Sequence, residues 1–334
     1  MPSPSCPAPT SPWRQALSIL ARNRSAMAAL GVLALITLAC MLAPLYAHMV
    51  AHTDPFTSNV AGTISFDGQV MDIMQPNDNP LHLGLSPIGP TWHAAYLLGA
   101  DSQGRDLAAR LLYGGRNSLL ISASAACICL FLAAVAGVTA GFCGGIVDSI
   151  ICRVLDIMWA VPVYLFAISL SIVMVSQKLV LGPFVVRADS LLVPIMILAL
   201  VYVPYAARPI RGRVLALRQA EFVLAARCLG IPGWRIMLRD ILPNLTTTLV
   251  VLGPLLMALA LLAESALSFL SLGVQAPAAS WGTIIQDGEG LIYTRPMVAI
   301  APGVAIVLVV LALNILGDGL RDALDVRDAA RRTS

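Results

Sequence analysis

Histidine and carboxylate side chains are the residue types here that could do chemistry, and they are sparse. His48 and His52 are four residues apart and could share one helix face, and His82 and His93 follow in the same hydrophilic stretch. Imidazoles grouped in this way can bind nickel or zinc. Because histidines scattered through a loop are more often solvated, we predict no metal site.

Acidic residues in apolar stretches are the second candidate group. Glu264 is costly to bury unless it is paired or hydrated, so it is a candidate for lining a polar translocation path, although a structural hydrogen-bond anchor is the simpler role. Asp148 and Asp156 have no histidine beside them, and an ion pair with Arg153 accounts for Asp156. The sequence contains neither a nucleophile with its base nor the phosphate-binding pattern G-x-x-x-x-G-K-[ST]. We therefore predict no catalytic residues and no enzyme activity in this chain.

The elements that must position these residues are apolar. Of the 334 residues, 58% are apolar and 12% are charged, against about 25% charged residues in an ordinary soluble domain. Charge-poor runs approach the roughly 20 residues with which a helix crosses about 30 Å of hydrocarbon. They cover 26–47, 118–142, 157–175, 191–207, 245–263 and 297–316, with Pro194 and Pro204 as candidate kinks in the fourth. We predict an all-α integral membrane protein with six transmembrane helices.

The distribution of charge predicts the orientation. With the N-terminus inside, most of the 21 basic residues fall on the cytoplasmic face, in agreement with the positive-inside rule. The opposite side receives Arg105, Arg110, Arg116, Lys178, Arg187 and Arg295. Both termini are therefore expected in the cytoplasm. The net charge of +3 gives no argument for a nucleic-acid partner.

The same pattern divides the chain into segments. We expect a cytoplasmic tail over 1–25 (disordered over 1–12), a first transmembrane helix over 26–47, an external loop and pre-span segment over 48–116, a membrane core over 117–317 and a cytoplasmic tail over 318–334. Within the core, Gly137 and Gly141 form a G-x-x-x-G spacing that permits close helix packing.

The core also contains a basic internal loop over 208–243. Residues 221–229 can form a short helix in which Ala225 and Ala226 permit close approach. Gly230 tolerates the left-handed conformation that ends a helix, and Pro232 prevents the helix from resuming. Such a helix can lie in a groove of a soluble partner and transmit its movement. A basic loop that only enforces topology is the alternative.

The loop resembles the EAA loop of ABC importer permeases, in which an Ala-Ala pair precedes a glycine and, about a dozen residues later, a Leu-Pro. Ala225 and Ala226, Gly230, and Leu242 with Pro243 match this spacing. Leu224 stands where the family has glutamate, and Glu221, one turn earlier, can supply a comparable charge. The resemblance implies an ATPase-coupling set of Glu221, Ala225, Ala226, Arg227, Gly230, Pro232, Arg239 and Pro243.

The resemblance covers the chain from about residue 98 to the C-terminus and is to dipeptide and oligopeptide permeases of the DppC/OppC kind. Before the second span, the signature residues are Gly104, Arg105, Asp106, Gly115 and Arg116. Further matches cover 264–273, 280–282 and 314–325.

The resemblance implies a type I ABC importer permease fold with a cytoplasmic coupling helix, in the bacterial inner (plasma) membrane. It implies as partners a second, homologous permease of the DppB/OppB kind, two ABC ATPase subunits (DppD/DppF- or OppD/OppF-like, or one fused ATPase) and an external substrate-binding protein. ATP and Mg would be bound by the ATPases, with no cofactor on this chain. The implied cargo is di- or oligopeptides, and nickel or another small solute is the alternative.

An ion-coupled secondary transporter working alone is a competing class. It would show internal repeats, broken helices and several ionisable residues near the membrane midplane. Glu264 is the only residue in the sequence that qualifies as such an ionisable residue, so we do not favour this class.

Overall fold

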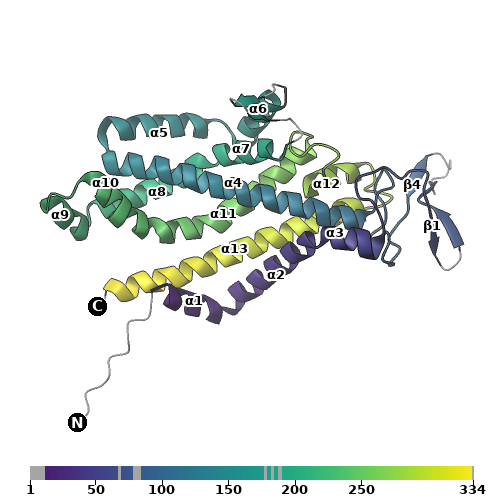
Figure 1. Cartoon of the computed structure of the whole chain (residues 1–334), viewed down its shortest axis with the longest axis horizontal. Helices are drawn as coiled ribbons and strands as arrows, with labels where there is room; N and C mark the ends of the chain where they lie inside the picture. Colours follow the sequence, from purple (N-terminus) through teal and green to yellow (C-terminus); the bar gives the residue numbers. More distant parts are fainter. Residues whose placement is uncertain are drawn as a thin grey trace, which may run out of the picture.

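The computed structural model describes residues 12–66, 69–77, 84–176, 179–181, 184–186 and 190–332. Over these residues the chain forms an elongated helical bundle (Figure 1). Small β-hairpins lie at one end of the bundle, and the short helix α9 (Glu221–Cys228) lies at the other. We refer to these as the hairpin end and the α9 end.

Helices long and apolar enough to cross a membrane make up most of the bundle. Among the described residues, four do so as single helices, and two bent pairs can each serve as one further span. The single spans are α2 (Arg24–Met41), α4 (Leu107–Cys143), the run Gly233–Phe269 that ends in α11 (Leu242–Phe269), and α13 (Met297–Arg332). The pairs are α5 (Gly145–Ala160) with α6 (Val163–Ser176), and α7 (Leu192–Val201) with α8 (Val203–Arg218). With each pair taken as one span, the count agrees with the prediction of six.

Proline explains both breaks. Helices α5 and α6 differ in direction by 92°, and Val161 between them is extended because Pro162 disfavours a helical residue before it. Helices α7 and α8 differ by 44°, with Pro204 in the first turn of α8, a position that suits proline. The predicted kink is thus confirmed at Pro204. The single helix predicted over 157–175 is wrong, because proline splits it and its first part begins at Gly145.

Helix α4 runs along the centre of the bundle. It begins at Leu107, not at residue 118, because Asp106 caps it by accepting hydrogen bonds from the backbone N–H groups of Ala108 (2.9 Å) and Ala109 (3.3 Å). Residues 107–116, predicted as the segment before the second span, are therefore helical and continuous with that span.

Close packing of α4 on α8 confirms the expectation for the glycine pair. A Cβ atom at Gly137 would lie 2.8 Å from the carbonyl oxygen of Ala207, and one at Gly141 would lie 2.8 Å from Val214. Any larger residue at these positions would push α8 away from α4.

The hairpin end is built from short elements after α3 (Ala43–Leu45) and the π-helical turn η1 (Tyr46–Ala51). Strand β1 (Thr63–Phe66) pairs with β2 (Gln69–Asp72), and β3 (Met74–Pro76) pairs with β4 (Leu85–Pro87), both antiparallel. Ile73, Ile88, Tyr96 and Ala100 form a small buried cluster beneath them. A third hairpin, β5 (Leu179–Leu181) with β6 (Phe184–Val186), follows α6. Helix α12 (Trp281–Glu289) starts with a capping box formed by Ser280 and Thr283.

The predicted tails also contain helix. Helix α1 (Pro12–Arg22) packs against the C-terminal part of α13, where Leu20, Ala26 and Ala323 form a buried cluster. Both segments lie toward the α9 end (Figure 1). The expected disorder over 1–12 lies almost wholly outside the described residues.

The region predicted as an internal loop over 208–243 is mostly helical. It contains the end of α8, then α9, α10 (Gly233–Ile236) and the π-helical turn η2 (Met237–Ile241). The Arg, Leu and Ala residues in its first part are good helix formers, so the fourth span continues to Arg218.

Candidate functional site

Helix α9 ends in the motif that the sequence predicts. Gly230 has a φ of +74°, in the left-handed region. Its N–H donates to the carbonyl oxygen of Arg227 (2.9 Å), and the N–H of Ile231 donates to that of Ala226 (3.1 Å). This is the Schellman arrangement, in which carbonyls at the helix end are satisfied by the two residues that follow. The short helix and its glycine terminator are therefore confirmed.

The two sides of α9 have different environments. Val223 and Ala226 are buried against the main core of the bundle. Glu221, Leu224 and Ala225 are exposed. Ala226 therefore packs within this chain, and Ala225 is the small residue that is open to a partner. Glu221 and Leu224, one turn apart, both lie on the exposed side.

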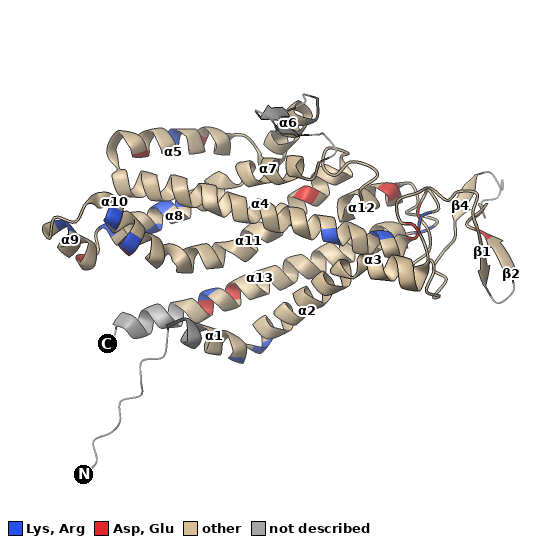
Figure 2. Cartoon of the chain, in the orientation of Figure 1, with Lys and Arg blue, Asp and Glu red and all other residues tan. Residues whose placement is uncertain are grey.

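An apolar patch surrounds α9. It consists of exposed Phe222, Leu224, Leu229, Ile231, Trp234 and Leu238, of which Leu229 has 79% of its surface exposed. Basic positions, coloured blue on the ribbon, gather along α8 to α10 at this end of the molecule (Figure 2). An exposed apolar patch with a charged rim is typical of a surface that docks another protein. We call this the α9 patch.

Contacts with α4 hold the α9 patch on the bundle. The guanidinium of Arg227 lies 5.6 Å from the ring centroid of Phe142, near the C-terminal end of α4. A Cβ atom on Gly233, which follows Pro232 at the start of α10, would also touch that ring. Arg239 in η2 and Pro243 at the start of α11 are exposed beside the patch. The predicted coupling residues thus lie along one continuous segment.

A cluster of four charged residues joins the hairpin end to the bundle. Asp101 contacts Arg105 Nε at 2.7 Å and Arg110 Nε at 3.1 Å. Asp287 of α12 contacts the same two guanidinium groups at 2.9 and 2.8 Å. Burial raises the pKa of Asp287, although Arg110 and Arg105 oppose this shift. We call these residues the charge cluster. Of these four residues, the sequence predicts only Arg105 as a signature residue. The spacing of four residues between Asp101 and Arg105 was the signal that could have predicted their ion pair.

The remaining signature residues surround this cluster. Asp106 also accepts hydrogen bonds from the Tyr96 backbone N–H and the Thr53 hydroxyl, both at 3.0 Å. Burial nevertheless raises the pKa of Asp106 above its ordinary value. Gly104 lies where a side chain would strike the backbone of Asn59, and Gly115 where it would strike Trp281 and Cys40. These positions therefore fix the junction between α4, α12 and the hairpin end, whereas Arg116 is exposed on α4.

Glu264 lies inside the bundle and is fully buried. Its carboxylate accepts a hydrogen bond from Ser268 at 2.7 Å and a longer one from Ser265 at 3.4 Å. Ser118 and Ser280 also interact with it. Serine hydroxyls therefore surround the carboxylate and connect α11 to α4 and to the start of α12.

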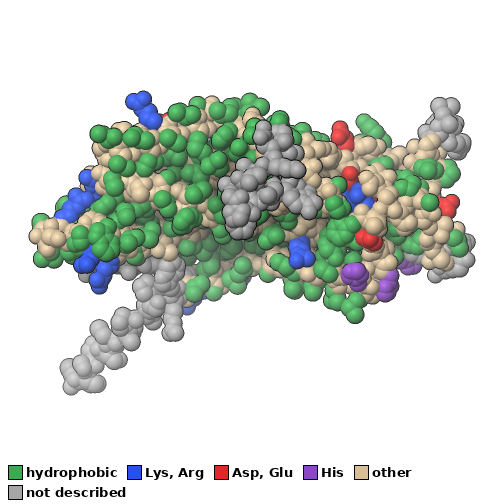
Figure 3. All heavy atoms as spheres, turned by 45° about the horizontal axis from the view of Figure 1, so that its top comes forward, with side chains coloured by type: hydrophobic (Ala, Val, Ile, Leu, Met, Phe, Trp, Pro, Cys, Tyr) green, Lys and Arg blue, Asp and Glu red, His purple; other side chains and the backbone are tan. Residues whose placement is uncertain are grey.

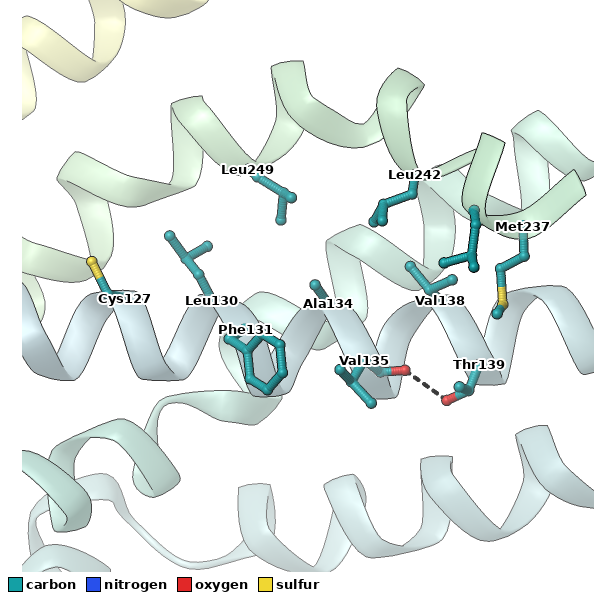
Figure 4. Close-up of a pocket in the computed structure, with 11 residues that line it drawn as sticks. Cys127, Leu130, Phe131, Ala134, Val135, Val138, Thr139, Met237, Leu242 and Leu249 are labelled. Carbon is teal, nitrogen blue, oxygen red and sulfur yellow. Dashed lines mark hydrogen bonds between the residues drawn. The ribbon is translucent and has the colours of Figure 1, made fainter. Parts of the chain in front are cut away.

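An apolar groove lies between α4 and the η2–α11 segment (Figure 4). Its volume is about 520 Å³, and its lining includes Leu130, Phe131, Val138, Met237 and Leu249. The hydroxyl of Thr139 is already bonded to the carbonyl oxygen of Val135 at 2.7 Å. The groove therefore suits lipid chains or another membrane helix better than a polar ligand.

Metal ligands are not assembled in the described part of the chain. No group of three or more His, Cys, Asp or Glu residues there could hold a metal ion. His48 and His52 line one hollow beside η1, whereas His82 lies outside the described residues.

Comparison with known proteins places this architecture in a family. Residues 133–327 match the family described as binding-protein-dependent transport system inner membrane component, and residues 11–65 match the N-terminal TM domain of oligopeptide transport permease C. The dipeptide transport system permease protein DppC of Alkalihalophilus pseudofirmus is 34% identical over 97% of this chain and 95% of its own length. The oligopeptide transport system permease protein OppC of Haemophilus influenzae is 32% identical over 95% of this chain and 89% of its own.

A solved structure agrees on the fold. The inward-facing MetNI methionine ABC transporter has a chain that aligns with a TM-score of 0.51 and 17% identity, covering 64% of this chain and 95% of that one. The expected type I importer permease fold is therefore confirmed. This multi-pass membrane chain belongs to the family of binding-protein-dependent transport system inner membrane components, among its DppC- and OppC-like permeases.

Proposed function

We propose that this chain is one of two membrane-spanning subunits of an ATP-driven importer for di- or oligopeptides. The relatives with which it aligns over nearly its whole length are dipeptide and oligopeptide transport permeases, which favours peptide over nickel as the cargo. The chain itself provides the passage and does no chemistry.

The observation that carries the mechanism is the α9 patch. Helix α9 is short, ends at a Schellman glycine, and exposes Glu221, Leu224 and Ala225. Its buried side packs on the bundle core through Val223 and Ala226. A partner that holds the exposed side can therefore move the bundle through the packed side. We assign this surface to a cytoplasmic ATPase that binds ATP and Mg²⁺.

The rest of the arrangement follows from that assignment. The α9 end, with both termini, is on the cytoplasmic side of the inner membrane. The hairpin end is on the outer side, where a substrate-binding protein delivers peptide. A second, related permease completes the passage, and two ATPase subunits bind beneath the pair. ATP-driven movement of the ATPases then shifts the passage between its outward-open and inward-open states.

The test uses the full complex in proteoliposomes, with uptake of labelled peptide and ATP hydrolysis measured together. Ala225→Arg places a long cation on the exposed side of α9. Gly230→Ala imposes a left-handed alanine, at a cost of about 1 to 2 kcal/mol, although a Cβ there has open space. We expect both variants to lose peptide uptake and the stimulation of ATP hydrolysis by loaded binding protein.

Matched controls separate coupling from general damage. Gly145→Ala carries the same kind of backbone strain, at a φ of +57° and in open space, but at the junction of α4 and α5 and not in the α9 terminator. Tyr293→Arg adds a cation at a side chain that is 99% exposed, between α12 and α13. Both controls should retain uptake. Unchanged uptake in Ala225→Arg and Gly230→Ala would refute the coupling assignment, and uptake of nickel but not peptide by the native complex would refute the cargo.

A further inference from the structure

A polar and aromatic cluster lies where α5 meets α8, and the α9 patch does not include it. Arg208 Nη2 donates a 2.7 Å hydrogen bond to Asp156 Oδ1. The same guanidinium lies 4.1 Å from the ring centroid of Trp159. Trp159 in turn stacks on Tyr205, with centroids 4.2 Å apart and ring planes at 24°. One carboxylate, one guanidinium and two rings are therefore in continuous contact.

The four residues of this cluster belong to the bent pairs α5–α6 and α7–α8, each of which can serve as one membrane span. Ala207, next to Arg208, packs on Gly137 of α4. Gly137 is about 10 Å from the C-terminal end of α4, at 1.5 Å per residue. The cluster also adjoins both helix breaks, since α5 ends at Ala160 and Tyr202 separates α7 from α8. Non-helical backbone at membrane depth is tolerated where it is buried in protein or lines a water-filled cavity.

The charged side chains of this cluster are more exposed than side chains that only pack inside the bundle. The side chains of Arg208 and Asp156 are 41% and 62% exposed. Charged groups at this depth are costly against hydrocarbon, so they face water or polar groups. Helix α5 has Leu155 as its buried residue, and many of its exposed side chains are apolar, such as Ile146 and Ile157. The charged pair is therefore a polar spot on an otherwise largely apolar exposed face, and it requires water or a polar ligand beside α5 and α8.

We propose that Asp156, Trp159, Tyr205 and Arg208 form a binding site for zwitterionic peptides on their path through the membrane. The proposal rests on the peptide cargo proposed above. The terminal carboxylate of a peptide replaces Asp156 on the planar guanidinium of Arg208, which can hold it through two hydrogen bonds. The terminal ammonium then pairs with Asp156, so each charge keeps a partner of opposite sign. The aromatic rings provide an apolar surface for side chains of varied shape.

The chain contains a second ion pair between α5 and α8, which serves as a comparison for Asp156 and Arg208. Asp148 and Arg211 join the same two helices through hydrogen bonds of 2.6 Å from both Nε and Nη2 of Arg211. Their side chains are less exposed, at 19% and 30%. If ion pairs only hold α5 against α8, loss of either pair should have the same effect.

The first arm of the test measures transport. Proteoliposomes that contain the full complex are given a labelled dipeptide whose side chains are uncharged. The number of peptides taken up per ATP hydrolysed is measured for four variants: Asp156→Asn, Arg208→Gln, Asp148→Asn and Arg211→Gln. We expect the first two variants to lower this ratio while ATP hydrolysis remains stimulated by loaded binding protein. The other two should match the native complex. Native complex that carries no peptide would refute the proposed function itself.

The second arm measures binding to the complex of permeases and ATPases without the binding protein. Loss of a hydrogen bond to a charged group should weaken dipeptide binding at least about tenfold in Arg208→Gln and Asp156→Asn. The same dipeptide with an acetylated N-terminus or an amidated C-terminus should bind the native complex more weakly. Equal losses in both pairs of variants, or native affinity in Arg208→Gln with normal peptide uptake, would overturn the proposed site.

Discussion

Asp101→Asn tests whether the charge cluster fastens the hairpin end to the bundle. Asp101 is fully buried and contacts both Arg105 and Arg110. The asparagine keeps the shape of the side chain but leaves two buried guanidinium groups facing Asp287 alone. Breaking a buried ion pair by removal of one partner costs about 3 to 5 kcal/mol. That is a large part of the roughly 5 to 15 kcal/mol by which a typical domain is stable.

The assay is thermal unfolding of the purified protein, followed by the fluorescence of its five tryptophans. Asp72→Asn is the control, because Asp72 is an exposed carboxylate of β2 in the same region and should change the free energy of unfolding by less than about 0.5 kcal/mol. Adding Arg110→Met to Asp101→Asn removes the surplus positive charge and should recover part of the loss. A midpoint for Asp101→Asn equal to that of Asp72→Asn would refute the reasoning.

Other variants test individual contacts by the same unfolding measurement. Asp106→Asn puts an amide N–H against the backbone and hydroxyl donors that the carboxylate accepts, and should cost about 1 to 3 kcal/mol. Since burial raises the pKa of Asp106, its contribution is greatest below the unfolded pKa, about 3.9, and is lost as pH rises through the folded pKa. The native protein should therefore gain stability relative to Asp106→Asn as pH falls from 7 toward 4, and a difference independent of pH would contradict this. Gly137→Val should separate α4 from α8 and lower the free energy of unfolding by at least about 1 to 3 kcal/mol. Gly253→Ala is the control, and it should be tolerated because the nearest contact of the added Cβ atom is at 3.8 Å. Equal unfolding midpoints for the two variants would count against close packing of α4 on α8. Ser268→Ala removes the shortest hydrogen bond to Glu264 and should cost about 1 to 3 kcal/mol, and an unchanged midpoint would mean that this bond is not needed.

Local chemistry in the sequence was sufficient for several elements. Charge-poor runs predict the spans, and the Gly137–Gly141 spacing predicts the close approach of α8. Gly230 predicts the end of α9 because few other residues adopt its backbone conformation. These features depend on residues near one another in the chain, so composition and spacing are enough to find them.

Features that depend on distant pairing were missed. Asp156 pairs with Arg208 and not with Arg153, because α8 packs beside α5, which no local spacing reveals. Asp287 joins Arg105 and Arg110 from a helix far along the chain. The break at Pro162 was missed because the apolar run continues on both sides of it, although proline was the available signal. On the surface, green apolar side chains cover the middle of the molecule, and most charged side chains lie toward its ends (Figure 3).

Helix α4 has one property that its neighbours in the two broken spans do not. It runs without interruption for 37 residues, or about 55 Å at 1.5 Å per residue. Its first turns carry Arg110 of the charge cluster, and its last turn carries Phe142, which touches Arg227 of α9. A rigid rod of this length that pivots by about 5° at one end moves the other end by about 5 Å, a distance close to one helical turn. Small angular changes at the junction with the hairpin end are thus enlarged into side-chain-sized displacements at the α9 end, without any intervening joint to absorb them.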